Sequence, residues 1–351
     1  MPTELAKEVG SDGSAAGGGR SDLSEWQRSV CEEAVLPATR APGTATVQCY
    51  GYKYPLLPFF FAKWFVYAIM KLTIQKGGDS MRKIRKMIVF LAVLAALVLW
   101  IAWGNQALQL NTYEIQSDRL PAAFDGFRIL QLSDIHNTQL GDENEKLLAT
   151  TKEAKPDMIV ITGDMIDSRN TKVDVALQLA QELVKIAPCY FVPGNHEARV
   201  GQYSTLKAGL VDLGVTVLEN EKTEITIAGA AITLAGVTDP DFGTALTLEE
   251  LTGGDGYTIL LSHRPELFET YVVSGVDLVF SGHAHGGQFR VPFVGGLYAP
   301  HQGLFPQYDG GIYTEGNTTM VVSRGIGNSI VPFRINNRPE IVLVELASQA
   351  D

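Results

Sequence analysis

Short apolar runs alternate with amphipathic stretches over the second two-thirds of the chain. Residues 112–117 alternate like a strand, and apolar runs typical of buried strands occur at 127–132, 157–162, 189–192, 258–261, 277–280 and 341–346. Between them, helical periodicity is found at 142–154, 173–186, 202–213 and 267–273. This alternation predicts an α/β domain over residues 111–348, and no internal repeat accompanies it.

Side chains able to bind metal follow most of these predicted strands. They are Asp134, His136, Asp164, Asn195, His196, His263, His283 and His285. Open α/β sheets gather their sites at the carboxyl ends of strands, so we expect these side chains to lie close together. Oxygen and imidazole donors without thiolates suit manganese, iron, zinc or magnesium. The pattern therefore predicts a metal site.

Five short sequences carry a specific family resemblance. They are Asp-Ile-His at 134–136, Gly-Asp-Met-Ile-Asp at 163–167, Gly-Asn-His-Glu at 194–197, Ser-His at 262–263 and Gly-His-Ala-His at 282–285. In this order they resemble the calcineurin-like metallophosphoesterase superfamily. Gly-Gly-Gln at 286–288 and Ser-Arg-Gly-Ile-Gly at 323–327 resemble its membrane-anchored bacterial branch, which includes UDP-diacylglucosamine hydrolase-like phosphodiesterases.

The resemblance implies a fold and a set of ligands. The expected fold is an α/β (α+β) four-layer sandwich of two mixed β-sheets flanked by helices, with a dinuclear metal site at the carboxyl ends of the strands. One divalent ion is expected on Asp134, His136, Asp164 and His285. The second is expected on Asp164, Asn195, His263 and His283, so that the carboxylate of Asp164 bridges the two ions.

The same resemblance implies hydrolysis of a phosphodiester or pyrophosphate bond by a metal-bridging hydroxide, with His196 as general acid. Asp167 is expected to orient His196 and stabilise its charge. Two divalent ions carry four positive charges, of which two carboxylates and the hydroxide neutralise three, so the site still attracts an anionic phosphoester. Lipid-linked and envelope phosphoesters are candidate substrates. Two alternatives are a phosphomonoesterase with the same site and a catalytically silent scaffold, which the complete ligand set disfavours.

The phosphate-binding arginines are less well defined. Some superfamily members place such an arginine directly after the final aspartate of the second sequence, where this chain has Ser168. Arg169, Arg199 and Arg324 are the candidates for phosphate contact. His301, the sixth histidine, is expected in a loop near the rim of the site.

Composition excludes some classes of function. The chain has 39 acidic and 28 basic residues and a net charge of −11, so no nucleic-acid-binding surface is expected. Cysteine is scarce, with Cys31, Cys49 and Cys189, so neither a disulfide framework nor a zinc–thiolate site is expected. The sequence leaves the oligomeric state open.

A basic and then apolar stretch precedes the α/β pattern. Residues 81–86 read Met-Arg-Lys-Ile-Arg-Lys, the form of a bacterial export signal, and no charge occurs over 87–103. As a helix, 87–103 would be about 25 Å long, with Lys86 at one membrane interface and Trp100 and Trp103 at the other. Residues 81–110 are therefore predicted to form a single signal anchor in the cell membrane, with the domain outside the cytoplasm. The alternative is cleavage near 102–104 and secretion.

Residues 1–80 differ from the remainder of the chain. A Gly/Ser/Ala-rich segment at 10–19 and the lack of helical or strand periodicity favour disorder. Residues 76–79 (Lys-Gly-Gly-Asp) can be encoded by a purine-rich ribosome-binding sequence just before Met81. Our hypothesis is that Met81 is the true start and that 1–80 are an over-extended gene prediction.

Overall fold

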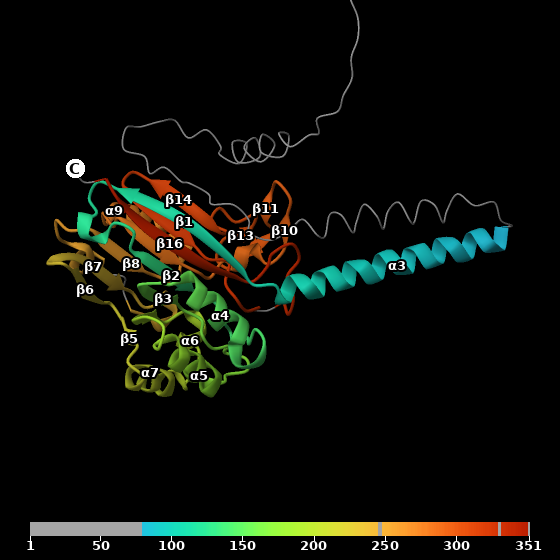
Figure 1. The fold of residues 1–351 in the computed structure, drawn as a ribbon, viewed down its shortest axis with the longest axis horizontal. Coiled ribbons are helices and arrows are strands. Elements are labelled where there is room, and N and C mark those ends of the chain that lie inside the picture. Colours follow the sequence, from blue (N-terminus) through green and yellow to red (C-terminus); the bar gives the residue numbers. More distant parts are fainter. Residues whose placement is uncertain (1–78, 245–247, 329–330, 350–351) are drawn as a thin grey trace, which may run out of the picture. The chain divides into compact units, whose positions relative to one another are not determined.

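The computed structural model describes residues 79–244, 248–328 and 331–349. Two six-stranded mixed sheets form the centre of the domain, and helices cover their outer faces (Figure 1). This arrangement confirms the predicted sandwich of two mixed sheets flanked by helices. The expectations for residues 1–78, namely disorder or an over-extended gene prediction, lie outside the described residues.

The first sheet has the strand order β1-β16-β2-β3-β4-β5. All neighbours are parallel except β16 and β2, which are antiparallel. The strands span Gln109–Ser117 (β1), Arg128–Leu132 (β2), Met158–Thr162 (β3), Cys189–Val192 (β4), Thr216–Val217 (β5) and Glu340–Ser348 (β16).

The second sheet has the order β14-β15-β9-β8-β7-β6, with antiparallel pairs at both edges. Its strands are Glu221–Ile227 (β6), Ala230–Gly236 (β7), Thr258–Leu261 (β8), Leu278–Ser281 (β9), Gly311–Glu315 (β14) and Thr318–Val322 (β15). Two small hairpins lie outside both sheets and consist of Arg290–Val291 (β10), Gly295–Gly296 (β11), Tyr298–Ala299 (β12) and Gly303–Leu304 (β13). The sequence pattern predicts no strand at β14 or β15.

The helices include one long amino-terminal helix and several short ones in the domain. They are Asp79–Gln106 (α3), Glu145–Ala154 (α4), Val173–Leu183 (α5), Asn195–Ala198 (α6), Tyr203–Asp212 (α7), Glu249–Thr252 (α8) and Phe268–Val273 (α9). Short 3-10 segments lie at Ala122–Phe124, Asp142–Asn144, Pro240–Phe242, Pro265–Leu267 and His285–Gly287. By length and composition α3 can cross a membrane, and none of its described residues is buried.

Alternation along the strands explains why both faces of each sheet are apolar. In β2, Ile129 packs between the sheets, whereas Leu130 and Leu132 face the helices. In β9, Phe280 packs between the sheets and Val279 faces the layer that contains α9. Because each of these strands is covered on both sides, its sequence reads as a continuous apolar run.

The stacking of the two sheets brings their strand ends to one edge of the domain. The segments after β2, β3 and β4 come from the first sheet and carry Asp134, Asp164 and Asn195. The segments after β8 and β9 come from the second sheet and carry His263 and His283. Contacts between these side chains therefore depend on the packing of one sheet on the other.

We expect Phe280→Ala to destabilise the fold, because the fully buried ring fills space between the sheets. The loss should be about 3–5 kcal/mol, as for other buried aromatic truncations. Urea unfolding of the metal-free protein measures it. Val273→Ala is the control, since that side chain is 89% exposed, and it should change stability by under about 0.5 kcal/mol. Equal effects of the two changes would contradict this description of the core.

Candidate metal centre

Two groups of buried side chains meet at the edge formed by the strand ends. One group contains Asp134, His136, Asp164 and His285, and the other contains Asp164, His263 and His283. In each group, one ligand atom from every residue lies within 4.8 Å of the others. Asp164 belongs to both groups, so one carboxylate joins the two halves of the site.

The first group is held mainly by loops after β2 and β9. The Nε2 atoms of His136 and His285 lie 3.1 Å apart, and His285 Nε2 lies 3.3 Å from Asp134 Oδ1. Asp134 also accepts hydrogen bonds from the Ser133 hydroxyl and from the backbone N–H of His283. These bonds fix the carboxylate, so its position does not depend on the neighbouring histidines alone.

The second group joins the first sheet to the second. His263 Nε2 lies 3.3 Å from Asp164 Oδ2, 3.2 Å from Asn195 Oδ1 and 3.1 Å from His283 Nδ1. The other ring nitrogen of His263 lies 2.7 Å from the carbonyl oxygen of Thr162. That contact fixes the ring so that Nε2 faces Asp164 and Asn195, which is how an outer hydrogen bond orients a ligating histidine.

Burial keeps most of these imidazoles neutral. It lowers the pKa of His136 and that of His285 to about 3, and it lowers the pKa of His283 well below its usual value. His263 differs, because burial opposes protonation but the adjacent carboxylate of Asp164 prevails and raises its pKa to about 10. Burial likewise opposes the charge on Asp164, but His263 and His136 hold its pKa well below the usual range.

This set of donors fits two divalent cations. Neutral imidazole nitrogens, two carboxylates and one amide oxygen are hard or borderline ligands, and no thiolate is among them. Buried His136 Nδ1 has no hydrogen-bond partner within the described part of the chain. Such closely spaced lone pairs and carboxylates repel one another unless cations or protons lie between them.

Comparison with known proteins agrees with this geometry. The sequence profile of the calcineurin-like phosphoesterase family matches residues 127–287. The uncharacterized metallophosphoesterase YkuE of Bacillus subtilis is 33% identical over 254 residues, which cover 69% of this chain and 86% of that protein. The chain belongs to the calcineurin-like metallophosphoesterases. It is accordingly a hydrolase of phosphoric ester bonds, in a family that uses a dinuclear divalent metal site.

Two further relatives are similar over most of the domain. The transmembrane protein with metallophosphoesterase domain of Bos taurus is 31% identical over 300 residues, covering 78% of this chain but only 66% of that protein. Phosphodiesterase YaeI of Escherichia coli K12 is 30% identical over 225 residues, covering 63% of this chain and 82% of that protein.

His196, the expected general acid of this metallophosphoesterase, lies beside the first group. Its ring packs edge-on against His136, with centroids 4.4 Å apart. The backbone N–H of Ser168 donates to His196 Nδ1 at 2.9 Å, which places the proton of the neutral ring on Nε2. Asp167 is 3.8 Å from Nδ1 and instead bonds Arg169. The turn directs the Ser168 N–H at the ring and places Asp167 beside it, so the orienting role of Asp167 stays a prediction.

The three predicted arginines have other partners. Arg169 pairs with Asp167, Arg199 pairs with Asp241, and Arg324 bonds Glu340. Arg169 is the one whose partner lies next to His196. Arg324 lines a pocket beside α3.

Two arginines that the sequence analysis did not single out contact the site directly. Buried Arg264 places Nη1 3.2 Å from His283 Nε2 and 2.6 Å from His301 Nδ1, and Asp239 holds its other nitrogens. Buried Arg334 places Nη2 3.4 Å from His285 Nδ1. The position of Arg264 directly after His263 could have indicated its role, whereas nothing adjacent in the sequence marks Arg334.

Glu197 connects the two loops that carry Asp164 and Asn195. Its carboxylate accepts backbone N–H groups of Asp164, Ile166 and Gly194. Burial and the nearby charge of Asp164 raise the pKa of Glu197 to about 8, while the three N–H donors act in the opposite direction. The side chain therefore fixes the loop after β3 on the start of α6.

We expect Gly282→Ala to weaken metal binding by about tenfold or more, the effect typical of a lost support beneath a ligand. A Cβ on residue 282 would lie 1.9 Å from Ser133 Oγ and 2.5 Å from Asp134 Oδ2, so it would displace that carboxylate. Metal titration with manganese measures the change. Gly254→Ala is the control, because a Cβ there has no atom within 4 Å. Unchanged affinity in the Gly282 variant would show that Asp134 does not bind metal.

Proposed function

We propose that this metallophosphoesterase hydrolyses phosphodiester or pyrophosphate bonds at a site of two divalent ions on the outer side of a membrane. The observation that carries the proposal is the shared position of Asp164 between two sets of buried histidines. A carboxylate has two oxygens and can face two cations, which makes Asp164 the natural bridge. The name of the Escherichia coli relative, a phosphodiesterase, favours a diester.

The distances support the ligands that the family resemblance implies. One ion would be held by Asp134, His136, Asp164 and His285, and the other by Asp164, Asn195, His263 and His283. Manganese, iron, zinc and magnesium all suit such donors. When bound, the pair supplies an activated water and neutralises charge on the phosphoryl oxygens. The proton on His263 would leave when an ion binds, because a metal ligand needs the free lone pair.

The chain's own side chains would supply the remaining chemistry. As a general acid, His196 would donate the Nε2 proton of its protonated ring to the leaving oxygen and return to a neutral imidazole, and in the protonated ring Nδ1–H would face the Ser168 hydroxyl at 3.2 Å. The charge of Asp167 at 3.8 Å would stabilise the ring when it is protonated. Arg264 would contact the phosphate more directly than Arg199 or Arg324, because it already touches His283. Arg169 would contact the phosphate from the side on which His196 lies.

The membrane assignment depends on α3. This helix carries Arg82, Lys83, Arg85 and Lys86 near its start, and exposed apolar residues cover the rest. Basic residues favour the cytoplasmic side, so the domain at 111–348 would lie on the other side as an anchored unit. The bovine relative is named as a transmembrane protein. Lipid-linked phosphoesters, as in the UDP-diacylglucosamine hydrolase-like branch, are the substrates we favour.

We expect Asp164→Asn to lower metal affinity at least about 100-fold and to abolish most hydrolysis, because the bridge loses its charge. Metal analysis and hydrolysis of bis-p-nitrophenyl phosphate with added manganese measure the two effects, and a phosphomonoester run in parallel identifies the bond preferred. Asp212→Asn, an exposed position at the end of α7, is the control. Full activity of the Asp164 variant, or activity that survives complete chelation, would refute the two-metal proposal.

We expect His196→Ala to keep its metal and to lose about 10²–10⁴-fold in turnover, the usual share of a general acid. The loss should be largest for substrates with poor leaving groups, because these need the proton most. Comparing turnover across aryl phosphodiesters of graded leaving-group pKa measures this dependence. If the variant loses its metal instead, His196 is a ligand and the assignment of roles is wrong.

A further inference from the structure

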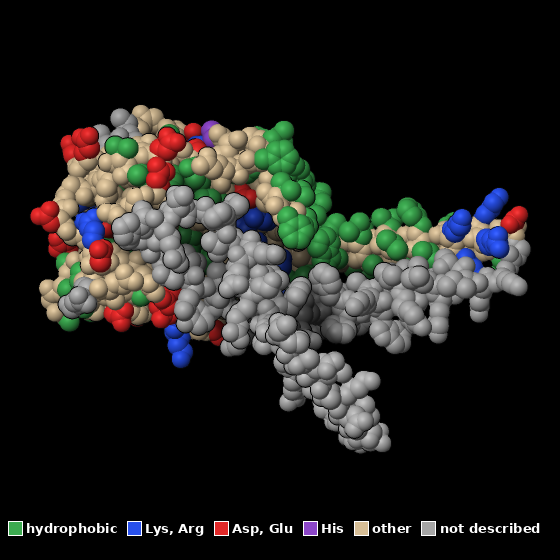
Figure 2. Space-filling model, turned by 90° about the horizontal axis from the view of Figure 1, so that it is seen from above, with side chains coloured by type: hydrophobic (Ala, Val, Ile, Leu, Met, Phe, Trp, Pro, Cys, Tyr) green, Lys and Arg blue, Asp and Glu red, His purple; other side chains and the backbone are tan. Residues whose placement is uncertain are grey.

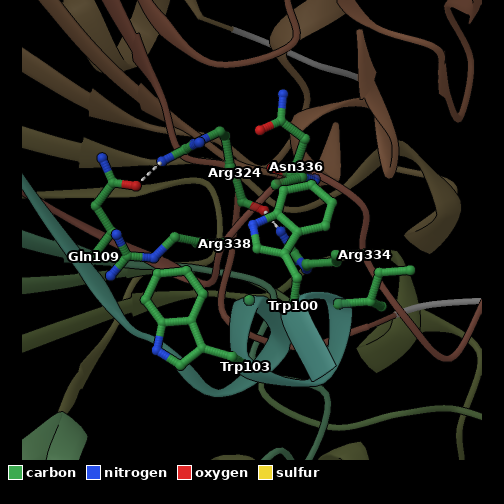
Figure 3. Close-up of a pocket in the computed structure, with 10 residues that line it drawn as sticks. Trp100, Trp103, Gln109, Arg324, Arg334, Asn336 and Arg338 are labelled. Atoms are coloured by element: carbon green, nitrogen blue, oxygen red, sulfur yellow. Dashed lines mark hydrogen bonds between the residues drawn. The ribbon is translucent and has the colours of Figure 1, made fainter. Parts of the chain in front are cut away.

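A pocket of about 340 Å³ lies where the end of α3 meets the segment before β16. None of the candidate metal ligands lines it, although its Arg334 also reaches His285. Figure 3 shows the indole rings of Trp100 and Trp103, from α3, beside the arginines of the domain. The arginines are Arg324, Arg334 and Arg338.

The charge of the pocket is opposite to that of the protein. The chain has a net charge of −11, yet the pocket is lined by three arginines and, among the described residues, by no aspartate or glutamate. Glu340 balances Arg324. The described residues include no salt bridge to buried Arg334, whose guanidinium bonds carbonyl oxygens of Arg324 and Gly327. A buried guanidinium held in this way favours an anion nearby.

The pocket is built from fixed parts. Asn105, at the end of α3, accepts from the backbone N–H of Arg334 at 2.7 Å and donates to its carbonyl oxygen at 2.9 Å. Arg338 donates to the carbonyl oxygens of Ala107 and Leu108 and lies 5.2 Å from the centre of the Trp103 ring. The arginines are therefore positioned before any ligand arrives, which lowers the entropic cost of binding.

An exposed apolar surface adjoins the same end of α3. Figure 1 places β10, β11 and β13 beside the carboxyl end of α3, and Figure 2 shows hydrophobic side chains gathered where the domain meets the helix. The exposed apolar residues of this region are Val291, Phe293, Val294, Leu304, Phe305 and Phe333. Exposed apolar side chains that continue from a membrane helix, beside two tryptophans, are typical of a surface that rests on a bilayer.

We propose that this pocket binds the phosphate-bearing headgroup of an anionic phospholipid at the bilayer surface. The inference rests on α3 crossing the membrane, which is part of the proposed function, and goes beyond the hydrolytic activity. Phosphate oxygens would accept hydrogen bonds from Arg334 and Arg338, while Trp100 and Trp103 lie at the interfacial depth. The acyl chains would lie along the exposed apolar side of α3. The lipid would then hold the domain in one orientation on the membrane.

Native mass spectrometry of the full chain in detergent, with phosphatidylglycerol or phosphatidylcholine of identical acyl chains, tests the proposal. We expect phosphatidylglycerol to be retained at least about fivefold more, the effect of roughly one charge interaction at a membrane surface. Asn336→Asp adds a negative charge to the pocket on an exposed side chain and should remove this preference. Asn317→Asp adds the same charge in the turn between β14 and β15 and should retain it.

A second pair of variants separates charge from folding. Arg338→Gln should also lose the preference, and Arg119→Gln, which removes an arginine paired with Asp277 outside the pocket, should keep it. Thermal unfolding shows whether each variant is folded. If Arg338→Gln does not fold, Asn336→Asp alone decides whether the pocket binds the lipid. Equal retention of the two lipids by the unmodified chain, or normal retention by Asn336→Asp, would overturn the proposal.

Soluble phosphate could present the same oxygens to the pocket as a lipid headgroup. Displacement of phosphatidylglycerol by excess inorganic phosphate would show that the pocket takes soluble phosphate, and the lipid proposal would fail. Hydrolysis of bis-p-nitrophenyl phosphate by the same samples keeps the two proposals distinct. In the unmodified chain, absent hydrolysis with a clear preference for phosphatidylglycerol counts against the metal site alone, and normal hydrolysis without that preference counts against the pocket alone.

Discussion

The architecture depends on one buried carboxylate, that of Asp164. Its Oδ1 accepts the backbone N–H of His196, and its Oδ2 lies within 3.6 Å of ring nitrogens of His136 and His263. A carboxylate that is 1% exposed stays ionised only if positive charge or N–H donors surround it. His136 comes from the first sheet and His263 from the second, so this requirement is met only when the sheets are packed together. The site is therefore complete only in the folded domain.

Backbone conformation at the strand ends imposes a second constraint. Asp134, His136, Asp164, His283 and His285 all have φ between 48° and 65°, in the left-handed region that side chains other than glycine disfavour. Each such residue costs on the order of 1–2 kcal/mol, and the surrounding sheets and hydrogen bonds must offset that cost. In return, the left-handed conformation aims the side chain. A residue in this conformation just after a strand points toward the site, whereas a continued strand would alternate its side chains between the two faces. Strain concentrated at five candidate ligands is consistent with cations that recover part of the energy.

The sequence predicted more of the candidate ligands than of the residues around them, and the reason is physical. Candidate ligands such as His263 and His283 follow apolar strands closely, and a strand end is visible in the hydrophobic pattern. Arg334 reaches His285 from 49 positions along the chain, through a loop whose course is set by contacts far away in sequence. Ser168 and Asp167 are neighbours, and only the turn conformation decides which of them faces His196. Strands β14 and β15 were not predicted, since β15 reads Thr-Thr-Met-Val-Val without strict alternation and becomes fully buried only through its neighbours.

The connection between α3 and the catalytic domain is too short to act as a flexible tether. The helix ends at Gln106 and β1 begins at Gln109, so two residues separate them. Asn105 bonds both backbone polar groups of Arg334, and the side chain of Arg334 reaches His285. Tilting the helix against the domain would therefore break two hydrogen bonds and move the guanidinium that contacts a candidate ligand. A continuous set of contacts thus leads from the end of α3 to the metal centre, and it couples the orientation of the helix to the position of that centre more strictly than a linker could.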